Sequence, residues 1–222
     1  MELVKVDSDA PTFWRQVEIQ IAAFPSAKFV QRVSVGQVTL AHYHAILETV
    51  FHQTQAGPYS FAKAAVNCSW QHGHAKEYLL RHAEEERMHW RWVLDDLRNT
   101  GYCGASPTTQ FPHASCEAFI SYQSRIAEQM PVGRLAVAAV LEGIGAAFGS
   151  TRTRRLLQLL DIAPTQATFF LSHGETDKTH TLALQEAIAG CKLSVRDWGW
   201  MTHSARVAGQ FYRAMYDHEA FQ

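Results

Sequence analysis

Apolar residues recur at every third or fourth position along most of the chain, which is the pattern of helices that bury one face. Residues 9–11 have the features of a helix start, and the segment after them places Phe13, Val17, Ile21 and Phe24 on one face. No run of alternating β-branched residues indicates a strand. The pattern therefore predicts an all-α protein.

Glycine, proline and small polar residues divide the rest of the chain into further predicted helices. Gly57 and Pro58 are expected to end the second helix, and the turn residues gathered at 101–114 predict the one clear loop. Ser115 is the expected cap after that loop. The predicted helices after the first cover about residues 36–55, 59–66, 74–99, 115–129, 131–148, 151–161 and 165–190, and the stretch after 194–197. Their short connections predict a single domain over residues 1–222.

Composition narrows the class of protein. A chain of 222 residues with 47% hydrophobic residues has enough apolar material for a core, and a formal net charge of −1 gives no basic field for nucleic acid. The longest apolar stretch, residues 135–149, is too short and too charged to span a bilayer, and the first residues lack a signal peptide's apolar segment. The 4 cysteines form no CxxC pair, which is typical of reduced thiols. We therefore expect a cytoplasmic protein that binds neither nucleic acid nor membrane.

A carboxylate and an imidazole share one face of the predicted helix over 74–99. Glu86 and His89 are three residues apart, so a helix places them within about 60° of each other. A Glu-x-x-His pair of this kind builds carboxylate-bridged metal sites inside helical bundles. The pair is also typical of a solvated charged face, which is our interpretation of Glu84 and Glu85.

The apolar stretch over 135–149 contains one carboxylate, that of Glu142. Nearly every face of this helix is apolar, so the side chain is expected to point inward, where an unpaired charge costs several kcal/mol. It then needs a metal, a proton or a cation, and a buried arginine is the open alternative. Gly143, Gly145 and Gly149 would let a neighbouring helix approach closely.

Three further ligand-type residues follow helical spacing in the segment over 165–190. His173, Asp177 and His180 are spaced i, i+4, i+7, so all three project from one stripe of the helix. Two imidazoles and a carboxylate in register supply three lone-pair donors to one volume. Such a triplet is much less often accidental than a lone histidine.

Together these segments predict a site for two metal ions. The candidate catalytic and metal-binding residues are Glu86, His89, Glu142, His173, Asp177 and His180. Oxygen and nitrogen ligands without thiolate suit iron, and also manganese, better than structural zinc. Six donors exceed what one catalytic metal needs if a position stays open for dioxygen, but they suit two metals with about three protein ligands each.

The set resembles the haem-oxygenase-like di-iron oxidases and oxygenases, a TenA-like scaffold family that includes an alkene-forming fatty-acid decarboxylase and a chlamydial p-aminobenzoate-forming enzyme. The resemblance covers about residues 40–185 and rests on Glu86-x-x-His89, Glu142 followed by glycine, and His173-x3-Asp177-x2-His180. It implies a bundle of roughly seven to nine helices, two loosely bound Fe(II) ions, dioxygen as co-substrate and a homodimer. Family members cleave C–C bonds or oxygenate the nitrogen of small amino-acid- or fatty-acid-derived substrates, and the reaction of this chain stays open.

Several other residues are weaker candidates. Some members of the family carry a carboxylate at the position of His82, which we interpret here as a supporting or structural residue, with Glu85 as a spare ligand. His44, Glu48 and His52 lie on one stripe, but packing or surface roles are favoured for them. Lys63 is expected to be exposed, and Cys103, His113 and Cys116 are spaced too irregularly for a zinc site. The tryptophans expected to pack the core are Trp90, Trp92, Trp198 and Trp200.

Two other functions stay open at this stage. The same scaffold supports metal-free thiaminase-like pyrimidine hydrolases, which use a cysteine nucleophile. A non-catalytic iron-binding protein is the second alternative. Bound iron together with dioxygen consumption would distinguish the di-iron enzyme from both.

Overall fold

A computed structural model describes residues 9–221, and helices and turns make up this part of the chain. The helices are α1 (Ala10–Ala23), α2 (Lys28–Val35), α3 (Leu40–Asn67), α4 (Gly73–Glu86), α5 (Trp90–Asn99), α6 (Ala114–Gln129), α7 (Gly133–Ile144), α8 (Ser150–Leu160), α9 (Phe169–Ala189) and α10 (Val195–Met215). No strand occurs over residues 9–221, so the all-α prediction is confirmed.

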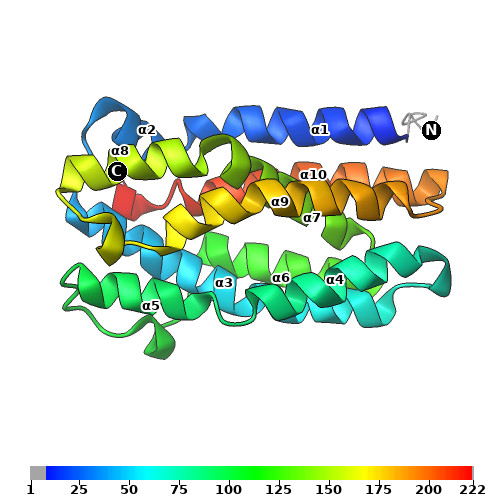
Figure 1. Cartoon of the computed structure of the whole chain (residues 1–222), viewed down its shortest axis with the longest axis horizontal. Helices are drawn as coiled ribbons and strands as arrows, with labels where there is room; N and C mark the ends of the chain where they lie inside the picture. The colour runs from blue at the N-terminus through cyan, green and yellow to red at the C-terminus, as the bar shows by residue number, and fades with distance from the viewer. Residues whose placement is uncertain (1–8, 222) are drawn as a thin grey trace.

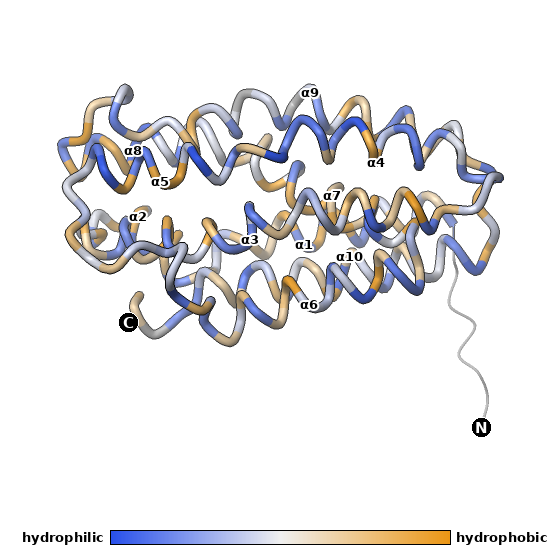
Figure 2. Tube along the Cα trace, turned by 90° about the horizontal axis from the view of Figure 1, so that it is seen from below, coloured by the Kyte–Doolittle hydropathy of each residue, from blue (hydrophilic) through white to orange (hydrophobic). Residues whose placement is uncertain are grey.

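The helices run along the long axis of the molecule, with α1 at one edge and α4 and α5 along the opposite edge (Figure 1). A view turned by 90° places α4 and α9 on one side and α6 and α10 on the other, with α7 between them (Figure 2). Helix α7 packs against α10, α9 and α1, and α9 also contacts α4. Helix α9 therefore contacts both α7 and α4, the helices that carry the other predicted ligands.

Helix α7 is central because its sequence has no polar face. Residues 135–140 are all buried, as the apolar stretch predicted. Among the described residues, the helical stretch Gly133–Leu160 is long and apolar enough to cross a membrane, but 56% of its most apolar window is buried inside the protein. A core helix meets the same criteria of length and composition.

Three predicted helix boundaries are wrong. Helix α3 continues through Pro58, although that residue offers no N–H to the carbonyl of Thr54, because packing on both sides holds the helix together. The predicted helix over 74–99 is interrupted at residues 87–89, where the bonds run from residue i to i−3. A π-helical segment, Gly145–Gly149, joins α7 to α8 where a break was expected.

Two smaller differences concern helix starts. Residues 28–35 form the separate helix α2, which the sequence pattern did not single out. The cap of α6 is His113, whose ring nitrogen accepts from the backbone N–H of Cys116, and Ser115 lies inside the helix. The side chain of His113 therefore does what a serine or asparagine does at most helix starts.

Candidate metal centre

The predicted ligands come together from α4, α7 and α9. Glu86 and His89 lie at the break after α4, Glu142 lies near the end of α7, and the remaining residues lie on α9. The structure brings together all six predicted residues: Glu86, His89, Glu142, His173, Asp177 and His180. Residues up to 94 positions apart in the chain thus lie at one place.

The first group of ligand-type atoms consists of Glu86, His89 and His173. The Oε2 atom of Glu86 lies 2.7 Å from Nδ1 of His89 and 3.5 Å from Nε2 of His173, and the two ring nitrogens are 3.2 Å apart. The other ring nitrogen of His173 lies 2.9 Å from the carbonyl oxygen of Phe169. Donation to that carbonyl leaves the lone pair of Nε2 free to face the group, an arrangement typical of metal-ligating histidines.

The second group consists of Glu142, Asp177 and His180, and all three side chains are buried. Nδ1 of His180 lies 3.2 Å from Oε2 of Glu142. Each of the three residues offers a ligand atom within 4.8 Å of the others. No arginine pairs with Glu142 in the described part of the chain, because histidines occupy that role.

His82 belongs to the cluster, although the sequence analysis gave it only a supporting role. Its Nε2 atom lies 3.0 Å from Oε1 of Glu142, and the residue is 2% exposed. It forms a third group of possible ligands with Glu86 and His180, which connects the first two groups. Its place one turn before Glu86 on the same helix face is the signal that could have found it. The spare candidate Glu85 lies at the edge of the cluster, with Oε2 3.6 Å from Nε2 of His180.

Charge and burial oppose each other inside the cluster. Burial alone would raise the pKa of Glu86 and Glu142, but hydrogen bonds from histidines outweigh it and hold both values below the usual range. Asp177 behaves in the opposite way, because burial and the adjacent charge of Glu142 raise its pKa far above the ordinary value. The metal-free site therefore holds a proton on Asp177 at neutral pH.

The close approach of α9 depends on glycine. A Cβ atom at Gly145 would lie 1.5 Å from Oδ2 of Asp177, so a larger residue there would displace that carboxylate. A Cβ atom at Gly149 would lie 2.7 Å from the Cα atom of Gly174 on α9. The predicted role of these glycines in helix approach is confirmed.

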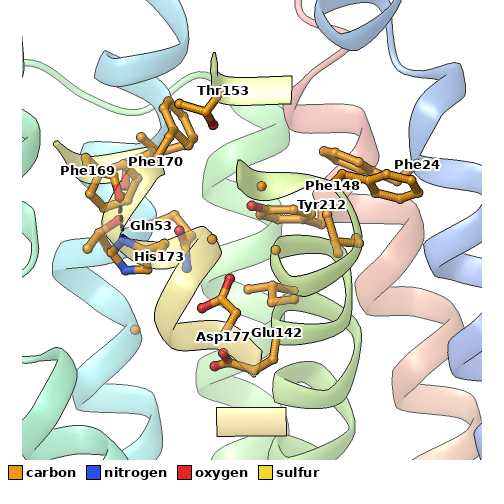
Figure 3. Close-up of a pocket in the computed structure, with 18 of the residues that line it drawn as sticks. Phe24, Gln53, Glu142, Phe148, Thr153, Phe169, Phe170, His173, Asp177 and Tyr212 are labelled. Carbon is orange, nitrogen blue, oxygen red and sulfur yellow. Dashed lines mark hydrogen bonds between the residues drawn. The ribbon is translucent and has the colours of Figure 1, made fainter. Parts of the chain in front are cut away.

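The cluster forms part of the wall of a mostly apolar cavity. Glu142 and Asp177 face it beside Tyr212, and Phe24 and Phe148 lie together on one side (Figure 3). The cavity holds about 180 Å³ of space for the centres of water molecules. Its size and lining suit a small organic molecule with an apolar body.

The remaining candidates lie away from the cluster, as favoured from the sequence. His44 contacts the hydroxyl of Thr100 at 3.0 Å, and the carboxylate of Glu48 accepts from the hydroxyl of Tyr102. Lys63 is half-buried, with 39% of its side chain exposed, and pairs with Glu128 at 2.9 Å. Neither His52 nor any of the four cysteines lines the cavity within residues 9–221.

The tryptophan prediction is partly wrong. Trp90 and Trp198 pack against the core, but Trp92 is 37% exposed and its ring stacks on that of His89 at 4.1 Å. His89 and Trp92 are three residues apart, a spacing that brings two side chains together on one helix face.

The fold is similar to that of several solved structures. A domain of unknown function from Shewanella denitrificans OS217, described as having a heme oxygenase-like fold, is 19% identical with a TM-score of 0.85, over 94% of this chain and 90% of that one. A TenA homologue from Pseudomonas syringae pv. tomato DC3000 is 10% identical with a TM-score of 0.75, and the match covers 93% of this chain and 90% of that one. A CADD-like protein of unknown function from Nostoc punctiforme PCC 73102 is 14% identical with a TM-score of 0.69, and the match covers 95% of this chain and 98% of that one.

The chain has the haem-oxygenase-like fold. The predicted scaffold is therefore confirmed, and at these identities the likeness concerns the fold alone. No family model and no curated protein matches the sequence. The chemistry must be argued from the residues that this haem-oxygenase-like chain places around its cavity.

Proposed function

We propose that the protein is a non-haem di-iron oxidase or oxygenase that uses dioxygen to oxidise a small substrate held in the cavity. The observation that carries the proposal is the set of three overlapping ligand groups at the cavity wall, linked through Glu86 and His180. Three imidazoles and three carboxylates, joined by His82, fit two iron ions, or manganese, without thiolate.

The chain's own residues have three tasks in this proposal. Bound iron would supply the electrons and the open positions for dioxygen. Phe169 orients His173 through its carbonyl, and the aromatic wall excludes water from the substrate. Asp177 releases its proton when a metal binds, because a ligating carboxylate must be ionised.

The proposed substrate is derived from an amino acid or a fatty acid, and the proposed outcome is C–C cleavage or N-oxygenation. The cavity supports a substrate with a hydrocarbon body, since most of the surface that lines it is apolar and phenylalanine, valine and leucine side chains contribute to it. A site built beside such a cavity also favours catalysis over simple iron binding.

A metal-free hydrolase with a cysteine nucleophile is less well supported. Burial raises the pKa of Cys68 to about 11 and that of Cys116 to about 12, which removes the thiolate that attack requires. Cys103 is exposed at the loop, away from the cavity residues.

The test is the iron content after anaerobic loading with Fe(II), followed by dioxygen uptake with and without candidate acids. We expect about two irons per chain in the wild type. His173→Ala and Asp177→Ala should stay helical but lose most iron and all iron-dependent oxygen uptake. His44→Ala is the matched control, because this histidine contacts Thr100 outside the cluster.

Full iron loading and turnover in either cluster variant would contradict the proposed site. A wild type that takes up neither iron nor dioxygen under any of these conditions would favour the hydrolase instead, and cysteine variants would then be the next test.

A further inference from the structure

Arg134 is a buried cation that forms no ion pair within 4.0 Å in the described part of the chain, although Glu142 and Glu86 act on its charge from a greater distance. It lies in the first turn of α7 and is 1% exposed, although the residues after it are apolar. Its only hydrogen bond there runs from Nε to Oγ of Ser60 at 2.9 Å, and its buried Nη1 atom has no partner. A buried charge left unpaired costs several kcal/mol, so such a group calls for an explanation.

The guanidinium group is held in a fixed orientation. Ser60 donates to the carbonyl oxygen of Gly57 at 2.7 Å, next to Pro58 inside α3, and accepts from Arg134 with the same oxygen. The guanidinium carbon lies 3.5 Å from the centre of the Phe61 ring. Two groups on α3 therefore hold Arg134 while a terminal nitrogen stays available.

This arginine lines the same cavity as the proposed metal ligands. Arg134, Phe61 and Ala138 belong to the cavity wall together with Glu86 and Glu142. Burial lowers the pKa of Arg134 to about 9, so the guanidinium keeps its charge at neutral pH. The ring of Phe61 lies 4.5 Å from that of His82, which places the arginine one side chain away from the cluster.

We propose that Arg134 binds the carboxylate of a monocarboxylic substrate whose apolar body fills the cavity. A carboxylate supplies the planar acceptor that a guanidinium prefers and pairs the buried charge. A ligand with one negative charge is favoured over a doubly charged phosphate. Glu86 and Glu142 line the same cavity, and their carboxylates repel the second charge of a phosphate. The role of this anion as a substrate rests on the proposed function, but its binding does not.

The experiment measures binding to the metal-free protein by calorimetry, with octanoate and its neutral isostere octanamide as probes. Because charge-assisted hydrogen bonds are about twice as strong as neutral ones, we expect octanoate to bind at least about tenfold more tightly. Arg134→Gln should reduce this ratio to about one, and Arg134→Lys should keep part of it. Arg98→Gln is the matched control, since Arg98 is an exposed arginine that pairs with Asp95 and does not line the cavity.

Equal binding of the two probes, or no binding of either, would overturn the proposal, and so would an unchanged ratio in Arg134→Gln. If that variant does not fold, a crystal structure of the wild type with octanoate decides, because the carboxylate must lie within hydrogen-bond distance of Arg134. The metal-free Asp177→Ala variant separates the two proposals. It should keep the preference for octanoate whether or not the wild-type protein binds iron.

Discussion

At the scale of single residues, the neighbouring carboxylates of Glu142 and Asp177 decide how the metal-free protein responds to pH. Burial and the charge of Glu142 raise the pKa of Asp177 far above its ordinary 3.8. Between the unfolded and folded pKa values, folding takes up a proton that the unfolded chain has released. The stability from protonated Asp177 is therefore complete below about pH 4 and is lost as pH rises toward the folded value.

Asp177→Asn should remove this pH-dependent loss, since the amide is neutral at every pH. At pH 7 we expect the metal-free variant to be more stable than the wild type by about 2 kcal/mol, or roughly 6 °C in Tm. The difference should disappear near pH 4, and thermal unfolding monitored by circular dichroism at both pH values measures it. Asp95→Asn is the control, because Asp95 is an exposed residue paired with Arg98. A variant less stable than the wild type at pH 7 would contradict the protonated state of Asp177.

At the scale of elements, the site depends on how α9 packs against the π-helical segment. The segment Gly145–Gly149 contacts α9, and glycines on both sides let the two backbones meet. A π-helical segment inserted between two α-helices is frequent at functional sites. Here it turns the end of α7 so that Glu142 and Gly145 both lie beside Asp177.

Gly174→Ala should push α9 away from this segment. Its new Cβ atom would lie 2.6 Å from the backbone nitrogen of Ser150, which cannot yield as a flexible side chain does. We expect a loss of about 2 kcal/mol and reduced iron content, measured by thermal unfolding and metal analysis. Gly73→Ala is the matched control, because nothing lies within 4 Å of its added Cβ and its effect should be neutral or slightly stabilising. Equal stability of the two variants would show that the close packing at Gly174 is not needed.

At the scale of the whole molecule, a metal centre that joins α4, α7 and α9 should stabilise the bundle. A ligand that binds only the folded state stabilises it by about 2.7 kcal/mol at 100 times its Kd. Anaerobic Fe(II) should therefore raise Tm by roughly 5–10 °C, and a chelator should reverse the shift. His173→Ala should abolish the shift, whereas His44→Ala should keep it. An identical shift in both variants would place the bound iron outside the cluster.

The amino-acid sequence was sufficient to predict the features that depend on the geometry of one helix. A rotation of about 100° per residue places Glu86 with His89, and His173 with Asp177 and His180, whatever the rest of the molecule does. The uniform apolar character of residues 135–140 likewise predicted that Glu142 is buried. These features depend on local spacing and polarity, which a single sequence contains.

The packing of the folded chain was needed to show which residues from different helices meet. Packing carries α3 through Pro58, and it interrupts the predicted helix over 74–99 at residues 87–89. The contact of His82 with Glu142 joins segments tens of residues apart. The burial of Arg134 without an ion pair among the described residues depends on the same packing. Helical periodicity fixes directions within a helix, but the relative placement of two helices depends on how all their side chains fill the shared core.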